Sequence, residues 1–394
     1  MTIMKTCVIT AEYNPFHNGH AWQIKQAREL GAENVVVVMS GNYVQRGTPA
    51  LFPKEVRVSA ALCCGADLVL ELPVPYAVSG AEQFASSAVH IANALGVADS
   101  LVFGTETDDI GEILEISNML LSEECDALIK EKLKTGESYA VARALAAEEL
   151  RRGSAEILTM PNNILAVEYC KAIIKSKSSL IPVCIKRKGV QHNSDKAEKG
   201  FASASFLRES PLEGWHGLVP AKANIMYSAE NIRGNIVDYS RFETAVLSRL
   251  RACTPQGLAR LREASEGLEY ALYNAVQQAV SLEQVYAKTK SKRYAHSRIR
   301  RMVLCAVLGI TTVLPELPPY IRVLGANNRG FALLGQTKGK LKLPVSHSLA
   351  NLEKLSLETA AVASAEVRGG NLYSLCLKTP QPAGGEYRYS IVKV

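Results

Sequence analysis

A regular alternation of short apolar runs and helical patterns fills the first 104 residues, and it limits the possible folds more than any other feature. The apolar runs lack a polar face, which is typical of strands covered on both sides of a sheet. They occupy residues 6–13, 34–41, 67–73 and 99–104. The intervening patterns predict helices at 19–30, 54–66 and 79–97. This order predicts an α/β fold: a Rossmann-like, doubly wound parallel sheet with right-handed crossovers.

The remainder of the chain is predominantly helical in pattern. Helices are expected over 110–151 and 161–176, and a fifth strand over 180–189. A second helical region runs from about 240 to 310. The tail from 318 onward is expected to mix short strands, glycines and one or two helices.

Charge divides the chain into two unequal parts. Residues 1–210 carry 21 Lys and Arg against 25 Asp and Glu, whereas residues 211–394 carry 24 against 13. We therefore expect a ligand-binding α/β domain at 1–210 and a basic, largely helical and mixed α/β domain at 211–394. A basic half often binds nucleic acid, although a solvated basic surface without a partner has the same composition.

Composition argues against several classes of protein. We find no run of eighteen apolar residues, so no transmembrane helix and no membrane partner are expected. The N-terminus has no signal-peptide pattern, and the nine cysteines form no CxxC pair. We therefore expect a cytoplasmic protein whose cysteines are reduced and do not form a metal site.

The loop after the first apolar run has the composition of a phosphate-binding site. In an open parallel sheet, ligands bind at the carboxyl ends of the strands, and this loop reads EYNPFHNGH. The helix that follows offers unpaired N–H groups and a positive dipole end, and Gly19 allows close approach of the backbone. Pro15 restricts Asn14 to an extended conformation. His17 and His20 are three residues apart, so they share a helical face and can both donate to phosphate oxygens.

Two other interpretations of the histidine pair remain open at this point. The pair could be half of a metal site, but no third ligand stands at a suitable spacing. It could also be an ordinary polar turn with surface histidines.

The loop and a later segment together resemble a known superfamily. NPFHNGH is similar to the HxGH signature of nucleotidyltransferases with the HIGH-type Rossmann-like fold. SASFLR, residues 203–208, is similar to the SSTxxR-like loop of that superfamily, with Ser205 where threonine is usual. The resemblance implies that the histidines contact ATP phosphates, and that Ser203, Ser205 and Arg208 contact the same nucleotide.

Ordered motifs narrow the resemblance. AEYNPFHNGH, VVVVMSGNYVQRGTPA, GADLVLELP, PNNILAVEY and TKSKRYAHSRIRR occur in this order, followed by a weaker match at IRVLGANNRG. Together they resemble the bacterial tRNA(Met) cytidine acetate ligase family. This resemblance implies a ligase that activates acetate with ATP as acetyl-adenylate and releases pyrophosphate. The acetyl group then passes to the exocyclic amine of the wobble cytidine of elongator tRNA(Met), which gives N(4)-acetylcytidine.

The resemblance also assigns site residues, with His17, His20 and Lys188 expected to be catalytic. ATP contacts carried over by motif fall on residues 10–23, namely Thr10, Ala11, Glu12, Tyr13, Asn14, Pro15, Phe16, His17, Asn18, Gly19, His20, Ala21, Trp22 and Gln23. They continue at Gly104, Asn162, Arg187 and Lys188. Mg²⁺ bridging the phosphates is the expected helper, with Asp67 and Glu71 as open candidates, and no dedicated protein metal site is expected.

Residue chemistry gives some of these assignments a reason. Gly104 ends a strand where a side chain would meet a base or ribose, although a plain turn glycine would look the same. Asn162 begins a helix and could reach the adenine or ribose; it could equally be an N-cap, and Asn163 could exchange roles with it. Arg187 and Lys188 can neutralise the departing pyrophosphate, unless they form a solvated charge run.

Two further segments are expected to meet acetate or RNA. The glycine- and proline-marked loop at 40–54 is a candidate lid, with Tyr43, Gln45 and Arg46 as contacts for acetate or the incoming base. The tract 288–301 combines cations and rings in the manner of single-stranded RNA sites. Its expected RNA contacts are Lys290, Lys292, Arg293, Tyr294, Arg298, Arg300 and Arg301, which would bind the tRNA anticodon loop rather than DNA.

Two alternative functions stay open on the sequence. A small-molecule nucleotidyltransferase would need the same loop but no basic second half. A non-catalytic module that binds ATP or RNA would not need the intact set of Asn14, His17, Gly19, His20 and Arg208.

Overall fold

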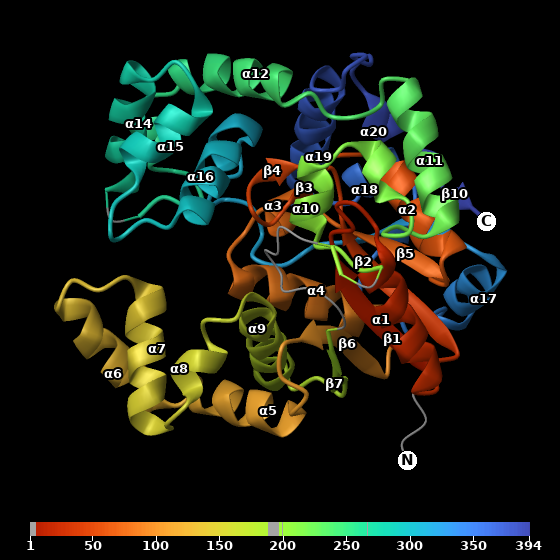
Figure 1. Cartoon of the computed structure of the whole chain (residues 1–394), viewed down its shortest axis with the longest axis horizontal. Helices are drawn as coiled ribbons and strands as arrows, with labels where there is room; N and C mark the ends of the chain where they lie inside the picture. The colour runs from red at the N-terminus through yellow and green to blue at the C-terminus, as the bar shows by residue number, and fades with distance from the viewer. Residues whose placement is uncertain (1–4, 188–196, 199, 266) are drawn as a thin grey trace.

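The computed structural model describes residues 5–187, 197–198, 200–265 and 267–394. Its centre is a mixed sheet in the order β10-β8-β5-β2-β1-β6-β7, with β9 paired to β8 (Figure 1). The strands are β1 (Thr6–Ala11), β2 (Asn34–Ser40), β5 (Leu68–Leu72), β6 (Ser100–Thr105), β7 (Ile181–Lys186), β8 (Ile321–Ala326), β9 (Val345–Ser346) and β10 (Val392–Lys393). All pairs are parallel except β5 with β8. The α/β prediction is confirmed, and β5-β2-β1-β6-β7 has the doubly wound order.

Both faces of the sheet are covered, which explains why the strands are apolar throughout. Val8 and Val36 are paired in register and face the side of α4 (Ala81–Leu95) and α9 (Pro161–Lys175). Their neighbour Ile9 faces the other side, where α1 (Asn18–Glu29) and α2 (Lys54–Cys63) pack. Alternate residues of each strand therefore enter two separate cores.

The helical region between β6 and β7 is broken more often than its pattern predicts. It comprises α5 (Ile110–Met119), α6 (Glu123–Lys134), α7 (Tyr139–Leu150) and α8 (Ser154–Ile157). Ser122 and Ser138 accept hydrogen bonds from the first turns of α6 and α7, so each serine starts a new helix. The predicted helix at 79–97 likewise begins later, after the separate short α3 (Val74–Ala77).

The segments between β7 and β8 form short helices and then a second helical layer. They are α10 (Ala204–Glu209), the 3₁₀ turn Leu212–Trp215, α11 (Ala221–Ile232), α12 (Tyr239–Arg251), α13 (Pro255–Leu258), α14 (Leu268–Gln278), α15 (Leu282–Thr289) and α16 (His296–Leu308). Helices α12 to α16 share one apolar cluster with part of α19 (Leu357–Leu375). They lie at the upper left of Figure 1, with α6 and α7 below them. In the described part of the chain no helix has the length and apolar character needed to span a membrane.

The C-terminal tail returns to the sheet and is more helical than predicted. Besides α19 it contains α17 (Asn328–Gln336), α18 (Leu349–Glu353) and α20 (Gly385–Arg388). Strands β8 and β10 extend the sheet beyond β5, so residues from the last quarter of the chain lie beside the first domain. The division at residue 210 stays a prediction.

A close backbone contact docks β8 and α17 onto the start of β5. Asn327 Nδ2 donates to Asp67 Oδ1 at 3.0 Å, and the Asn327 N–H donates to the Asp67 carbonyl at 3.0 Å. Arg28 forms an ion pair with the same carboxylate. A Cβ at Gly330 would lie 2.0 Å from the Asp67 carbonyl oxygen, so this position has room only for glycine. The motifs GADLVLELP and IRVLGANNRG therefore meet here.

We expect Gly330→Ala to lower the free energy of unfolding by about 3 kcal/mol, because the methyl group must displace a backbone carbonyl. Urea unfolding of both proteins measures this difference. Gly335→Ala in the same helix is the matched control: its Cβ would meet no atom, and the substitution should gain about 0.5–1 kcal/mol. Equal stability of the two variants would contradict the close-approach interpretation.

Candidate functional site

A cavity of about 510 Å³ opens at the carboxyl ends of β1 and β6. This is the position that the doubly wound order predicts for a ligand. Many of the predicted ATP contacts line it: Thr10, Ala11, Glu12, Tyr13, Asn14, His17, His20, Gln23, Gly104, Asn162, Arg187, Ser205 and Arg208. A smaller cavity of about 40 Å³ shares His17, His20 and Gly104 and adds Gly19 and Trp22. The fold therefore brings three predicted segments, far apart in sequence, to one place.

The two histidines form a capping box at the start of α1. The Gly19 N–H donates to His17 Nδ1 at 3.0 Å, and the His17 N–H donates to His20 Nδ1 at 3.2 Å. An Nδ1 that accepts a backbone N–H carries no proton, so each neutral ring holds its proton on Nε2. The box thus fixes the tautomer of both rings, with the proton of each ring on Nε2.

The electrostatics of the site favour a neutral His20 ring until an anion arrives. The rings are stacked with their centroids 3.8 Å apart. Burial, followed by the nearby His17 and Arg187, holds the pKa of His20 well below its usual value. His20 still has surface that faces the cavity. A triphosphate placed there would meet N–H dipoles, the end of a helix and arginine side chains.

Gly19 is explained by the histidine beside it. A Cβ at residue 19 would lie 2.8 Å from His17 Cε1, so any side chain would push the ring out of the capping box. Asn18 has a structural role as well: its Nδ2 donates to the carbonyls of Gly200 and Gly217, both at 2.8 Å. These bonds tie the start of α1 to the segments before and after α10.

Five of the predicted ATP contacts lie away from the two cavities: Pro15, Phe16, Asn18, Ala21 and Ser203. The Phe16 ring is fully buried in the core with α1 and α2, and its N–H donates to Tyr227 Oη at 2.9 Å. The Ser203 hydroxyl caps α10 by accepting from the Phe206 N–H. Sequence spacing could not separate these residues from their neighbours, because which side of a loop faces the ligand depends on what packs behind it.

Arg208 reaches the cavity from α10, as the SxSxxR pattern predicts. Its Nη1 donates to the Asn14 carbonyl at 2.7 Å, and its Nη2 donates to Ser205 Oγ at 3.1 Å. Asn14 is buried and accepts a hydrogen bond from the Leu51 N–H, so it supports the loop with its side chain. Arg208 and Ser205 therefore lie beside the histidine loop through a contact between residues 194 positions apart.

The start of α9 forms the next wall. Asn162 Nδ2 donates to Glu106 Oε1 at 2.5 Å, and its Oδ1 accepts from Arg187 Nη1 at 3.3 Å. Asn163 is fully buried and binds the backbone of residues 106 and 107, so Asn162 is the asparagine that faces the cavity. Gly104 lies beside Arg187, whose Cγ would be 3.4 Å from a Cβ at that position. Burial lowers the pKa of Arg187, which Glu106 opposes. Lys188 lies outside the described residues.

Several residues that line this cavity were not predicted as ATP contacts. They include the start of α4 at Gly80 and Ala81, Arg143 on α7, and Ser297 and Arg301 on α16. In all, five arginines and one glutamate line this cavity in the described chain: Arg46, Arg143, Arg187, Arg208, Arg301 and Glu12. A net positive cavity of this kind attracts anions. The sequence SGAEQ predicts the start of a helix, and this pattern could have identified Gly80 as a candidate ligand contact.

The segment 40–54 is packed rather than free. It contains the hairpin β3 (Tyr43–Val44) and β4 (Thr48–Pro49), and a Cβ at Gly47 would lie 2.6 Å from the Arg300 carbonyl carbon on α16. Tyr43 is buried and donates to the Gly369 carbonyl, so it cannot contact a substrate as suggested. Gln45 and Arg46 do line the cavity. The hairpin therefore contributes fixed side chains, and nothing in this packing supports a lid.

A buried arginine that the motifs did not single out holds the strand ends together. Arg57 on α2 is fully buried and donates to the carbonyls of Glu12 at 2.7 Å, Ser40 at 3.1 Å and Phe52 at 3.0 Å, and to that of Gly41. Its hydrogen bonds thus fix the loops that follow β1 and β2.

The predicted RNA tract spans the end of α15, a loop and the start of α16. Lys290, Lys292 and Arg293 are exposed. Tyr294 is buried in the helical cluster, so its ring is not placed to stack on a base, contrary to the prediction. Arg300 lies over the Tyr286 ring at 5.3 Å, and Arg301 forms an ion pair with Glu263 at 2.9 Å. Arg298 contacts Ser265 and the Tyr294 ring.

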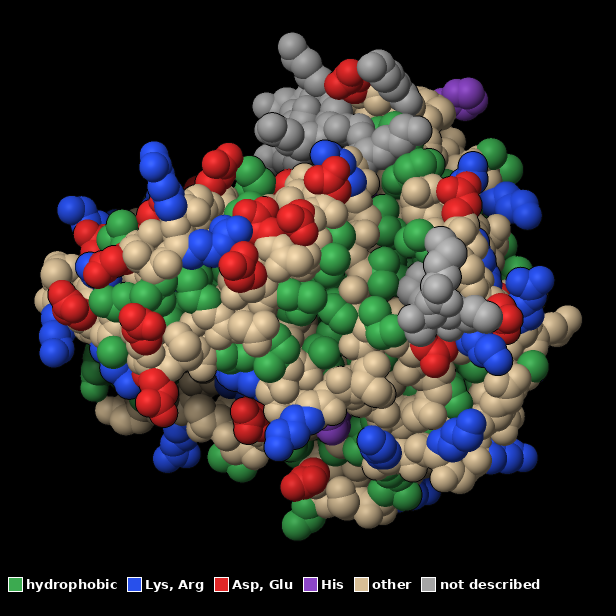
Figure 2. Space-filling view, turned by 90° about the horizontal axis from the view of Figure 1, so that it is seen from below, with side chains coloured by type: hydrophobic (Ala, Val, Ile, Leu, Met, Phe, Trp, Pro, Cys, Tyr) green, Lys and Arg blue, Asp and Glu red, His purple; other side chains and the backbone are tan. Residues whose placement is uncertain are grey.

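The face seen from below Figure 1 contrasts with this tract. Figure 2 shows Lys and Arg side chains intermixed with Asp and Glu toward α6 and α7, with no field of a single sign. A surface of this kind offers little to a phosphate backbone.

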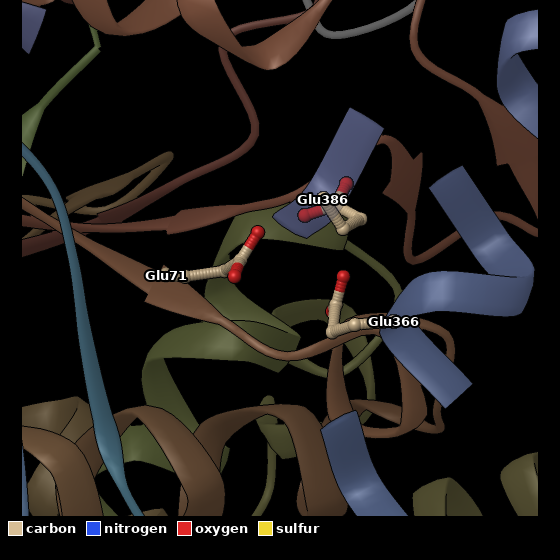
Figure 3. A group of neighbouring side chains, drawn as sticks. All are labelled: Glu71, Glu366 and Glu386. Atoms are coloured by element: carbon tan, nitrogen blue, oxygen red, sulfur yellow. The ribbon is translucent and has the colours of Figure 1, made fainter. Parts of the chain in front are cut away.

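One group of possible metal ligands occurs among the described residues, and it lies outside the cavity. The carboxylates of Glu71, Glu366 and Glu386 converge from β5, α19 and α20 (Figure 3). Lys54 Nζ lies 2.6 Å from Glu71 and 2.5 Å from Glu386, so an ammonium group already fills the position of a cation. Asp67 pairs with Arg28 at the opposite end of β5. Neither Asp67 nor Glu71 is placed to hold a nucleotide-bound Mg²⁺.

Comparisons with known proteins agree with this geometry. Residues 4–387 match a family model described as HIGH Nucleotidyl Transferase. The tRNA(Met) cytidine acetate ligase of Thermoanaerobacter sp. (strain X514) is 37% identical, with 98% of this chain and 99% of that protein covered. The enzyme of the same name from Acetivibrio thermocellus is 33% identical over 99% of this chain and 100% of that protein.

Solved structures resemble the whole chain. Thermotoga maritima TmcAL bound with alpha-thio ATP has a TM-score of 0.89 and 30% identity, covering 99% of this chain and 100% of that one. The apo form of that protein gives a TM-score of 0.91 at the same identity and coverage.

We expect the depressed His20 pKa to make the protein less stable in mild acid. The unfolded state binds a proton near pH 6.5, whereas folded His20 resists it, so the free energy of unfolding falls as the pH drops below about 6.5. His20→Gln keeps a side-chain acceptor for the His17 N–H but cannot titrate. Urea unfolding between pH 7.5 and 5 should therefore show that the free energy of unfolding falls more steeply with decreasing pH in the wild type than in His20→Gln. The difference in slope should be at most about 1.4 kcal/mol per pH unit. Parallel profiles would contradict the assigned neutral ring.

Proposed function

The chain belongs to the tRNA(Met) cytidine acetate ligase family within the HIGH nucleotidyl transferases, and on that basis we propose that it acetylates a tRNA cytidine in two ATP-dependent steps. In the first step, acetate and ATP give acetyl-adenylate and pyrophosphate. In the second step, the acetyl group passes to the exocyclic amine of the wobble cytidine of elongator tRNA(Met).

The observation that carries the proposal is the pair of Nε2–H donors at the start of α1. Two neutral imidazoles of fixed tautomer, a helix N-terminus and Arg208 converge on one end of the cavity. This arrangement binds phosphate oxygens and stabilises the charge that develops as pyrophosphate leaves. The alpha-thio ATP complex of the 30% identical TmcAL supports ATP as the ligand.

The first step needs charge screening rather than a general base. Acetate is ionised at neutral pH and must approach a triphosphate of the same sign. The arginines that line the cavity reduce this repulsion, and the walls hold both reactants for in-line attack. His17 and His20 act as hydrogen-bond donors in this scheme, and Arg187, together with Lys188, would neutralise the phosphates.

Mg²⁺ would enter with the nucleotide. Glu12 is the acidic residue among the described cavity lining, and its Oε1 already accepts from the Gln45 N–H at 2.8 Å. Mg²⁺ is commonly held by one carboxylate, water and phosphate oxygens, and this donor set fits that pattern through Glu12 alone. Bound in this way, the ion would further reduce the charge on the phosphates.

The second step requires an RNA base to reach the same cavity. Helix α16 connects the two: Ser297 and Arg301 line the cavity, and Lys290, Lys292 and Arg293 stand exposed just before this helix. An RNA loop held by those cations would place an extruded base at the cavity opening. The cytosine amine then attacks the acetyl carbonyl carbon, AMP leaves with the bonding electron pair, and the amine loses a proton.

We expect the protein, ATP and labelled acetate to convert total tRNA to a product containing labelled N(4)-acetylcytidine, detected by mass spectrometry of nucleosides. Exchange of labelled pyrophosphate into ATP should depend on acetate. His20→Ala should lower that exchange by at least 100-fold while RNA affinity changes less than twofold, because the ring contacts the phosphates.

The outcomes separate the competing functions. Acetate-independent transfer of a nucleotidyl group to a phosphate ester would favour a small-molecule nucleotidyltransferase. Binding of ATP or RNA without pyrophosphate chemistry would favour a non-catalytic module. Wild-type exchange in His20→Ala would contradict the role given to the histidine pair.

We expect the combined replacement of Lys290, Lys292 and Arg293 by Ala to weaken tRNA binding and to flatten its salt dependence by about one unit of slope per lost phosphate contact. Filter binding across a salt titration measures both. The matched control is replacement of Lys338, Lys340 and Lys342, which are also exposed and lie near the end of α4, away from the cavity. If both triple variants lose tRNA affinity equally, the tract 288–301 is not part of the RNA-binding site.

A further inference from the structure

One lobe of the large cavity lies on the side of the sheet opposite the histidine pair. Its lining comes from the start of α4, from β6, from α7 and from α9: Gly80, Ala81, Phe84, Phe103, Arg143 and Tyr169. Phe84, Phe103 and Tyr169 belong to the core of the α4 and α9 face, whereas α1 packs on the other face. The phosphate contacts proposed above leave this lobe without a ligand.

The lobe contains a buried cation with spare hydrogen-bonding capacity. Arg143 is 8% exposed, and its Nη1 lies 2.7 Å from Glu168 Oε1. Within the described structure its Nε has no hydrogen-bond partner. A guanidinium N–H buried beside a cavity and left without an acceptor indicates a missing acceptor in the ligand.

The charges around Arg143 do not balance. Glu168 also binds Lys171 at 2.7 Å, and Glu82 binds Lys171 at 3.7 Å and Lys175 at 2.8 Å. Three cations thus share two carboxylates, which leaves one positive charge for an anion. Because Glu82 is the second residue of α4, this chain of ion pairs also places Arg143 close to the first turn of that helix.

The start of α4 is open toward the lobe. Gly80 is its N-cap and provides no side-chain cap, and the helix is 15 residues long. A Cβ at Gly80 would meet no atom within 4 Å. The N–H groups of the first turn and the dipole of a long helix thus add to the cation.

The remaining walls are apolar and lie close to the reaction site. The Phe103 and Tyr169 rings are stacked at 5.5 Å. Burial raises the pKa of Tyr169, and the neighbouring Thr10 hydroxyl at the end of β1 opposes that rise. Thr10 and Tyr169 line the same cavity as His17 and His20, so these rings lie close to the loop that carries the two histidines. The lobe therefore offers an anion site, an apolar wall and direct access to the nucleotide.

We propose that this lobe is the acyl pocket, in which Arg143 and the first turn of α4 hold the carboxylate of a short-chain acid while Phe84, Phe103 and Tyr169 enclose its alkyl group. The assignment rests on the proposed function. It places acetate across the α-phosphorus from the histidines, as in-line displacement requires. A carboxylate oxygen forms a bond to the α-phosphorus, the bond to the bridging oxygen of the β-phosphate breaks, and pyrophosphate leaves with that electron pair. No proton is transferred.

The test uses acetate-dependent pyrophosphate exchange with full-length variants. Gly80→Leu would fill the lobe without breaking an ion pair, since residue 80 has φ −60° and accepts an L side chain. Arg143→Gln would remove the unbalanced positive charge. We expect both to raise the KM for acetate at least tenfold and to leave the KM for ATP within twofold. Gly335→Leu, at an exposed glycine with open space, should leave both constants unchanged.

The result that overturns the inference is an unchanged acetate KM in Gly80→Leu, or an equal rise in the KM values for acetate and ATP. A selective rise in the KM for tRNA would also overturn it, because the lobe would then hold the cytosine. Failure of the proposed function is distinguishable: wild type itself would then give no acetate-dependent exchange. As a second readout, Phe84→Leu should increase the ratio of propionate to acetate use at least threefold by widening the pocket.

Discussion

A buried set of charged groups joins the C-terminal part of the chain to the nucleotide-binding sheet. Arg322 on β8 and Lys54 at the start of α2 each bind both Glu71 on β5 and Glu386 on α20, at 2.5–2.9 Å. Burial and then Glu71 raise the pKa of Glu366 to about 8, so this fifth group holds its proton at neutral pH and two cations face two carboxylates. Breaking such a pair by removing one partner typically costs about 3–5 kcal/mol. The strand β8, the helices α19 and α20, and the hairpin before Lys54 are therefore held together as a unit.

That network explains why the histidine loop has rigid neighbours. The hairpin that carries Gln45 and Arg46 ends just before Lys54, and Gly47 packs on the backbone of Arg300. Arg57 links the same region to the carbonyl of Glu12. Cavity walls from segments as far apart as Gln45 and Arg301 are thus fixed to one another through buried polar contacts, which are specific in geometry and costly to leave unpaired.

Most of the fold of the first 210 residues was predictable from the sequence, because its strands are apolar on both faces and its helices begin and end at strong local signals. Motif spacing predicted that His17 and His20 share a helical face and that Arg208 lies near them, but it did not predict the capping box. The return of β8 and β10 to the sheet could not be predicted. Strand β8 pairs with β5 across about 250 residues, and a local sequence pattern does not specify which distant strand a strand will pair with. The same limit applies to one cavity wall, because Arg143 stands in a segment whose sequence is typical of an ordinary helix. The prediction that Tyr294 contacts RNA was wrong, because the sequence does not show whether an aromatic residue among cations faces solvent or is buried in a core.

The capping box at the start of α1 limits which substitutions this turn can accept during evolution. Each histidine is held by the backbone of the turn that contains the other, and Gly19 leaves no room for an alternative side chain. Losing either ring would remove the stacking partner of the other and leave one backbone N–H of the turn without its acceptor. A substitution at any of the three positions therefore disturbs the geometry of the whole turn.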